Sequence, residues 1–329
     1  MIRGFHAAAA ICAAAFFFAA AAPVRPVACR VYPAGEALAK RALTPGALVP
    51  SLGTVSVRVF KVGFADLPYH LPDPVLAAAD DSVSSRYLAM SRGRFTWAFS
   101  IDPDTLLAPR GARAYLGYGF DTLRAWIDQR LAAEGRSPGP SPSLAVIHFP
   151  EIGTGFAGYA SGSTVYLNGA YAADVLSHEL GHTLGLAHAR SLDPGGSRIS
   201  PLGGPATENE YGHALDVMGI GRGPSAHFNT HAKARLGWLD AVDIAEGAVG
   251  GIYRLSAADG PSDAHPRALR IPTATGDSAL EYWIEYRAGL PGALVQCTGY
   301  RDPEHPARRP GKPFGCCPRE IPAGLPRSC

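Results

Sequence analysis

Alternating apolar and polar residues mark the strands predicted in the first half of the chain. Residues 54–64 alternate and are rich in valine, which predicts a strand. Residues 94–101 predict a second strand, 144–149 a compact apolar strand and 164–167 a short one. Between these four segments the hydrophobic period changes, or glycine and proline accumulate, so the strands are predicted to be separate elements.

A longer period, in which apolar residues recur every three or four positions, predicts two helices between the first three strands. The first opens at the pair Asp73-Pro74, a good N-cap and first-turn combination, and ends at Gly93. Asp121 is placed to cap the second helix, which ends at Gly135. The residues expected to face the core are Leu76, Val83, Tyr87, Met90, Leu123, Trp126, Ile127 and Leu131.

A third helix is predicted over residues 171–185, directly after the last of these strands. Its leucines fall roughly opposite His178 and His182, so one face packs on the sheet and the other presents two histidines to a cleft. The glycine-rich run 153–162 is a candidate for the rim of that cleft. The order of elements predicts an α+β fold with a mostly parallel, twisted sheet and helices packed against it.

The two histidines open a run with metal-binding spacing: His178-Glu179-Leu180-Gly181-His182-Thr183-Leu184-Gly185-Leu186-Ala187-His188. Because they lie one helical turn apart, two neutral imidazoles can bind the same Zn²⁺. Glu179 cannot easily join them on the metal, but it can reach a water there as a general base. One helix therefore supplies two ligands and a base.

A third ligand is available only if the helix stops after His182. On a continuous helix His188 would lie ~15 Å from His178 along the axis, which is too far for one ion. Gly185 reaches positive φ without steric cost and suits a helix C-terminus, so we expect the chain to turn back there. Three histidine ligands leave a fourth position open for water, which distinguishes a catalytic zinc site from a structural one.

The histidine run resembles the zinc motif of the metzincin endopeptidases. In that superfamily a tight turn places a methionine beneath the zinc, and Met218 fits this place. The segments 210–219, 227–239 and 282–287 are together similar to the gametolysin family of secreted metallopeptidases. The resemblance spans roughly residues 54–296 and implies a metzincin-like fold, with the zinc helix at the cleft and a Met-turn subdomain.

The resemblance further implies a secreted enzyme that hydrolyses internal peptide bonds of extracellular or cell-wall proteins, with Zn²⁺ as its cofactor. The expected partner is a protein or glycoprotein substrate. A formal net charge of +2 gives no reason to expect nucleic acid as a partner. Ile220 stands where astacin-like enzymes carry a tyrosine, which excludes a tyrosine ligand at that place. His213 is interpreted as structural or exposed rather than as a ligand.

Two other functional classes are open to a chain with this motif. A zinc aminopeptidase usually takes its third ligand as a glutamate well downstream, and the close spacing of His188 argues against that class. The second alternative is a catalytically silent, zinc-bearing extracellular binding protein. The intact Glu179 argues against it, because a protein without turnover has no need of the base.

The N-terminal residues have the composition of an export signal. Residues 1–22 combine a positive start with an apolar run that ends in small residues, which predicts a secretory signal peptide. We therefore expect a secreted protein without stable membrane association after cleavage; an uncleaved anchor is the alternative. Residues 23–50 are predicted to be a linker or short pro-segment, in which Cys29 is interpreted as a disulfide cysteine rather than as a latency ligand of the zinc.

The remaining chain divides into three predicted parts. Residues 51–245 form the metzincin-like catalytic domain, and 246–296 form a short β-rich appendage. The appendage is expected to contain strands at 252–255, 268–271, 280–286 and 293–296. Residues 297–329 are rich in proline, arginine and cysteine, and they are predicted to be a disordered tail, with stapling by disulfides or a misread gene end as the alternatives.

Overall fold

The computed structural model describes residues 49–117, 119–136, 143–193, 207–223, 226–247, 251–261, 264–272, 280–288, 294–301 and 314–316. The predicted signal peptide, nearly all of the predicted linker and most of the predicted tail lie outside the described residues. Over the part of the chain that is described, no helix is both long and apolar enough to cross a membrane.

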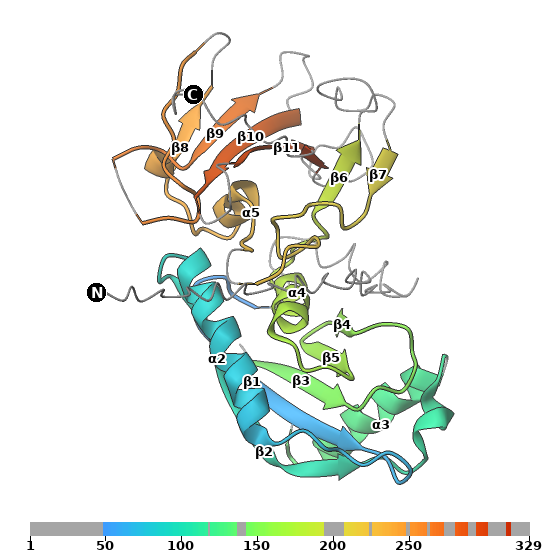
Figure 1. Cartoon of the computed structure of the whole chain (residues 1–329). Coiled ribbons are helices and arrows are strands. Elements are labelled where there is room, and N and C mark those ends of the chain that lie inside the picture. The colour runs from blue at the N-terminus through green and yellow to red at the C-terminus, as the bar shows by residue number, and fades with distance from the viewer. Residues whose placement is uncertain are drawn as a thin grey trace, which may run out of the picture.

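Five of the described strands form the first sheet, in the order β2-β1-β3-β5-β4 (Figure 1). Four of them are parallel: β1 (Gly53–Gly63), β2 (Phe95–Leu107), β3 (Ser143–Phe149) and β5 (Thr164–Asn168). The fifth, β4 (Gly158–Ser161), is an antiparallel edge strand. The mostly parallel sheet is therefore confirmed, whereas β4, inside the glycine-rich run, was not predicted as a strand.

Helices α2 (Asp73–Met90) and α4 (Ala173–Thr183) cover one face of this sheet, and α3 (Gly119–Ala133) covers the other. The alternation in β1 explains the division. Val55, Val57, and Val59 belong to the buried cluster with α2 and α4. After a register irregularity between Val59 and Lys61, the residues Phe60, Val62 and Phe64 belong to the cluster with α3. The sheet is thus apolar on both faces, as a helix-covered parallel sheet requires.

The two predicted helices are present with shifted starts. Asp73 was predicted to be the N-cap of the first, but it is the first residue of α2, and Pro72 is the N-cap. The Asp73 carboxylate instead accepts a hydrogen bond from Nζ of Lys61 at 2.7 Å, which occupies it outside the cap. Asp121 was predicted to cap the second helix but lies inside α3. All the residues predicted to face the core are buried except Trp126, which is half-buried.

Seven described strands form the second sheet, in the order β7-β6-β12-β11-β10-β9-β8. They are β6 (Arg190–Asp193), β7 (Thr207–Asn209), β8 (Ile244–Glu246), β9 (Ala268–Pro272), β10 (Leu280–Arg287), β11 (Leu294–Arg301) and β12 (Phe314–Cys316). This sheet takes strands from both sides of the boundary predicted at residue 246. It also takes β12 from within the predicted tail.

One predicted strand of the appendage does not form. Residues 252–255 are described, and they are not a strand. Ile252 is 89% exposed, so the apolar residues that suggested a strand have no sheet face to pack against. The other three predicted strands overlap β9, β10 and β11.

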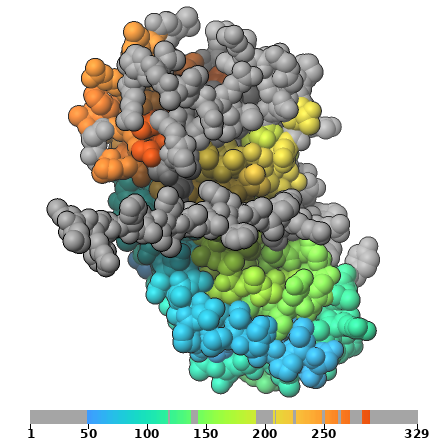
Figure 2. All heavy atoms as spheres, viewed as in Figure 1, coloured from blue at the N-terminus to red at the C-terminus, as the bar shows by residue number. Residues whose placement is uncertain are grey.

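The chain crosses between the two sheets at the end of α4. Figure 1 shows α4 on the side of the first sheet that faces the second one. Short helices α5 (Thr230–Arg235) and η2 (Ala241–Asp243) follow the crossing, and η1 (Ala112–Tyr115) precedes α3. In Figure 2 the yellow atoms of the chain beyond α4 lie above the green atoms of the first-sheet region. The histidine run therefore lies where the two sheet regions meet.

Candidate metal centre

Helix α4 ends soon after its second histidine. Its last residue is Thr183, and Gly185 follows with φ of 80°. The amide of Gly185 donates to the carbonyl of His182 at 3.0 Å, and the amide of Leu186 donates to that of Gly181 at 3.1 Å. These two bonds form a Schellman motif, in which a residue with positive φ ends a helix. Gly185 therefore makes the turn that the spacing of the histidines requires.

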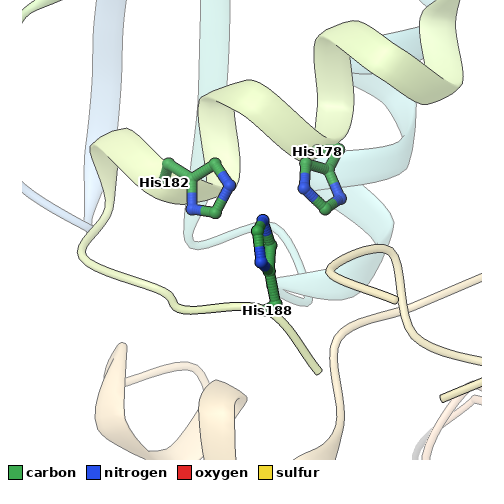
Figure 3. A group of neighbouring side chains, drawn as sticks. All are labelled: His178, His182 and His188. Carbon is green, nitrogen blue, oxygen red and sulfur yellow. The ribbon is translucent and has the colours of Figure 1, made fainter. Parts of the chain in front are cut away.

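The turn brings three histidines to one point (Figure 3). His178 and His182 point from the helix, and His188 reaches them from the chain beyond the turn. One ring nitrogen from each lies within 4.8 Å of the others. All three side chains come from a single stretch of eleven residues, so no distant part of the chain is needed to supply a ligand.

The hydrogen bonds of the imidazoles fix which nitrogen faces the common point. Nδ1 of His178 lies 2.8 Å from the Val217 carbonyl, and Nδ1 of His182 lies 2.8 Å from the Leu186 carbonyl. Because a carbonyl only accepts, each Nδ1 must carry the proton. Nδ1 of His188 donates to Oε1 of Glu210 at 3.0 Å. The three Nε2 atoms are buried without a hydrogen-bond partner among the described residues, so each directs a lone pair toward the others.

Burial keeps the imidazoles of His178 and His182 neutral. Desolvation lowers the pKa of His178 well below its usual value, and it lowers the pKa of His182 to about 3, with His188 adding to the effect. A neutral imidazole is the form that binds a metal. Three Nε2 atoms, buried and without a hydrogen-bond partner among the described residues, fit Zn²⁺, which prefers nitrogen and sulfur ligands in such sites.

Glu179 follows His178 on α4 and is buried next to the edge strand of the first sheet. A Cβ atom added at Gly158 on β4 would lie 2.6 Å from both Cγ and Oε1 of Glu179. The backbone of β4 thus passes directly against this carboxylate, and only glycine leaves room for it. The glycine-rich run predicted as a cleft rim does lie beside the site at this strand.

Met218 lies beneath the helix that carries the first two histidines. Its sulfur is in contact range of the position that a Cβ of Gly181 would take, so glycine is required there too. The carbonyl of Met218 accepts a hydrogen bond from the amide of Ala189 at 2.8 Å. The turn around Met218 is therefore packed against the helix on one side and bonded to the residue after His188 on the other.

Two residues beside the histidines were not singled out from the sequence. Glu210 accepts from His188, and this hydrogen bond lowers the pKa of the Glu210 carboxyl. The ring of Tyr211 lies with its centroid 4.2 Å from that of His188. Both belong to a segment quoted for the family resemblance, but their spacing from His188 gives no signal of contact. His213 is buried outside the histidine group, so it lies inside the fold and is not a fourth ligand.

Comparisons with known proteins add two solved structures. No family model matches the chain, and no curated protein matches it. Metalloproteinase-II from Bacteroides fragilis is similar at 14% identity and a TM-score of 0.36, over 60% of this chain and 59% of its own. OgpA from Akkermansia muciniphila is similar at 13% identity and a TM-score of 0.39, over 85% of this chain and 83% of its own.

These likenesses are too distant to carry a functional conclusion. This chain spans 59% of the length of the Bacteroides fragilis structure. The resemblance to the gametolysin family stays a prediction, since no family model matches. The chemistry of the site is therefore judged from its own side chains.

Proposed function

We propose that this protein is a secreted zinc-dependent endopeptidase that hydrolyses internal peptide bonds of extracellular or cell-wall proteins. The observation that carries the proposal is the convergence of three buried Nε2 atoms, each without a partner among the described residues, at the helix that also carries the buried Glu179. Each Nδ1 is already occupied by an acceptor, so the imidazoles are oriented before any ion binds. Such orientation by outer partners is what metal-ligating histidines show in general.

His178, His182 and His188 would hold the zinc, and they would supply three of its ligands. When bound, zinc supplies Lewis acidity, which acidifies water and polarises a carbonyl group. The chain itself supplies neutral ligands, so the positive charge of the ion is not cancelled by its protein ligands. Three protein ligands also leave room for water and substrate, which a structural site with four ligands does not.

Glu179 is the residue that we propose to move the proton. An ionised carboxylate only accepts hydrogen bonds, and it can take a proton from the water that attacks the scissile carbonyl. It can then deliver the same proton to the nitrogen of the departing amine, so that the carboxylate is regenerated. Its burial beside the histidines, and not on the open surface, supports this role.

An extended peptide is the substrate form that suits the site. Among the described residues, strand β4 is the outer strand of the first sheet, where it pairs with β5. A peptide that pairs with β4 would pass the place where Gly158 meets Glu179. Binding through main-chain hydrogen bonds suits internal positions of a protein chain. We therefore propose a protein or glycoprotein substrate, bound in an extended conformation.

The second candidate function is a zinc-bearing binding protein without turnover. The same histidine geometry favours it, because Nε2 atoms without a partner among the described residues indicate metal binding but say nothing about catalysis. The two candidate functions differ in whether Glu179 acts as a general base, and the variant Glu179→Gln tests that role. It keeps the size of the side chain and removes the proton acceptor, and His188→Ala serves as the metal-deficient control.

The test compares the secreted wild type with both variants for zinc content and for cleavage of an unfolded protein. We expect Glu179→Gln to bind zinc as the wild type does and to lose roughly 10²–10⁴-fold in cleavage rate, the usual range for a general base. His188→Ala should lose zinc and activity together. If all zinc-bound forms fail to cleave, the binding protein is the better interpretation. If Glu179→Gln cleaves as fast as the wild type, Glu179 is not the base.

Secretion is proposed from residues 1–22 alone, and it has its own test. The full chain and a chain that lacks these residues would be expressed in a secreting host, and the medium assayed for the protein. We expect only the full chain to appear there, with its N-terminus near residue 22. Retention of the full chain at the membrane would favour the uncleaved anchor.

A further inference from the structure

A buried arginine of the second sheet reaches into the turn that carries Met218. Arg287 is the last residue of β10 and is 0% exposed. Its guanidinium donates to the carbonyl of Leu215 at 2.8 Å, to that of His227 at 3.2 Å and to that of Phe228 at 3.1 Å. One side chain thus holds three backbone carbonyls of the segment that follows the metal ligands.

Glu285, two residues earlier on β10, orients this arginine. Its Oε1 accepts from Nε of Arg287 at 2.7 Å, and its Oε2 accepts from the amide of Thr230 at 2.6 Å. Thr230 is the first residue of α5. The pair therefore clamps the segment 215–230 at both ends, and the buried positive charge of Arg287 is balanced by the carboxylate.

The clamped segment is the one that orients two of the three histidines. Two residues after Leu215, the carbonyl of Val217 accepts from Nδ1 of His178. The next carbonyl, of Met218, accepts from the amide of Ala189, which follows His188. A displacement of the turn by a fraction of an ångström would therefore rotate one imidazole and move the chain that carries another.

Only arginine can make this set of bonds. The guanidinium is planar and carries five N–H donors in a fixed fork, whereas a lysine ammonium is a point charge on a flexible stem. A lysine at this position could keep the charge and one bond, but it could not span Leu215 and Phe228 while also facing Glu285. The bonds therefore require the geometry of arginine, and a positive charge alone would not reproduce them.

We propose that Arg287, oriented by Glu285, is a positioning residue of the metal centre. It fixes the turn from which the carbonyls of Val217 and Met218 hold His178 and the chain at His188. The second sheet then contributes to the geometry of the metal centre through Arg287 and Glu285. The inference rests on the proposed function, since it presupposes that the three histidines bind zinc.

The test uses Arg287→Lys and a matched control, Arg267→Lys. Arg267 is also buried in the second-sheet region and also donates to backbone carbonyls, those of Ala257 and Gly260 at 2.5 and 2.9 Å. Neither carbonyl belongs to the clamped segment. Zinc affinity would be measured by chelator competition on the full secreted chain, together with thermal unfolding and the visible spectrum of the Co²⁺-substituted protein.

We expect Arg287→Lys to weaken zinc binding about tenfold or more, the range found when outer partners of metal ligands are removed. Its cobalt spectrum should shift, because the ligands are reoriented. Arg267→Lys should lower thermal stability yet keep both zinc affinity and the cobalt spectrum. Equal zinc affinity in the wild type and both variants would overturn the inference while leaving the proposed function intact. A wild type that binds no zinc would remove both.

A second variant separates positioning from folding. Arg287→Ala leaves a space of the size of the lost side chain, and free guanidinium at millimolar concentration can enter such a space and restore the missing donors. We expect guanidinium to recover part of the zinc affinity of this variant and to leave that of Arg267→Ala unchanged. If guanidinium has no effect, or affects both variants alike, Arg287 does not position the centre. Should Arg287→Ala not fold, the comparison of the two lysine variants decides.

Discussion

The region of the first sheet and the region of the second sheet differ in what their buried charges bind. Two clusters of buried apolar residues pack on the two faces of the first sheet, and one of them continues to Met218, Phe228 and Trp238 beyond α4. In the first-sheet region the buried Asp102 binds Arg58 and Arg136, whereas in the second-sheet region the buried Arg267 and Arg287 donate to backbone carbonyls. Apolar contacts have no preferred direction, whereas each of these charges needs a partner at a fixed place.

The candidate metal centre draws on both regions, and it takes a different contribution from each. The helix that carries His178 and His182 packs on the apolar core of the first sheet. The acceptors that orient His178 and His188 come from residues 210–218, next to the polar contacts of the second region. The first region thus supplies the ligands, and the second fixes their orientation. Mutations in the two regions should therefore separate stability from metal affinity.

The largest expected loss of stability comes from the apolar region. Ile147 on β3 is fully buried in the cluster with α3, away from the histidines. We expect Ile147→Ala to lower the free energy of unfolding by about 2–5 kcal/mol, through lost contacts and the cavity that remains. Zinc affinity of the folded protein should not change. Urea unfolding and chelator competition on the same preparation would check this. A parallel fall in zinc affinity would contradict the proposal that the apolar core of the first sheet affects stability but not the orientation of the metal ligands.

A polar change in the turn should lower both stability and zinc affinity. One carboxylate oxygen of Asp216 accepts from the amide of Met218, and the other accepts from the amide and side chain of Asn229, each at 2.8 Å. Asp216→Asn turns one acceptor into a donor that faces donors, which should cost about 1–3 kcal/mol of stability. Because the turn orients His178, we also expect zinc affinity to fall about tenfold.

The matched control for this change is Asp102→Asn. Asp102 is equally buried, but its partners are Arg58 and Arg136 in the first-sheet region. It should lose stability and keep zinc affinity. Calorimetry and zinc competition on both variants would show whether the turn is special. Equal zinc affinity in the two variants would contradict the role given to the turn.

The difference between the regions also explains what the sequence could predict. In the first region, buried apolar residues recur with a period of two in strands and of three to four in helices, and most elements lie within two or three residues of their predicted bounds. The exception is β2, which ends at Leu107, six residues beyond its predicted end. Strand β4 was missed because glycine at 158 serves the close approach to Glu179 and gives no strand signal. In the second region, strands as short as β7 and β12 are too short for a period.

The metal ligands could be predicted from the sequence, whereas the residues that orient them could not. The three histidines and Gly185 share one local run, so helical geometry alone shows that they can meet. Glu210 and Arg287 reach the site through contacts between residues far apart in sequence, and nothing in their local pattern indicates those contacts. A sequence shows directly which metal-binding side chains one helix and its following turn contain. It does not show which distant residues form hydrogen bonds that orient those side chains.

The pH dependence of stability tests the buried charges of the second region. Burial, with Arg287 nearby, lowers the pKa of Lys233 from 10.5 to about 7. Between pH 7 and 10.5 the unfolded chain therefore holds a proton that the folded protein has released, and stability rises with pH by up to about 1.4 kcal/mol per unit. In Lys233→Met this rise should vanish, and the variant should gain stability at pH 7 and below. Urea unfolding between pH 6 and 9 measures both curves, and identical slopes would refute the assignment.

The first region contains one group for which the sign of the pH dependence should be reversed. Burial raises the pKa of Asp80 on α2 from 3.8 to about 7, and its Oδ1 accepts from the hydroxyl of Tyr171 at 2.7 Å. Between pH 4 and 7 the folded protein holds a proton that the unfolded chain has released, so stability falls as pH rises through this window and is constant above it. Asp80→Asn keeps an acceptor for Tyr171 and cannot titrate. Its stability should match that of the wild type near pH 4 and exceed it at pH 7. A constant difference between the two across this window would mean that Asp80 stays ionised.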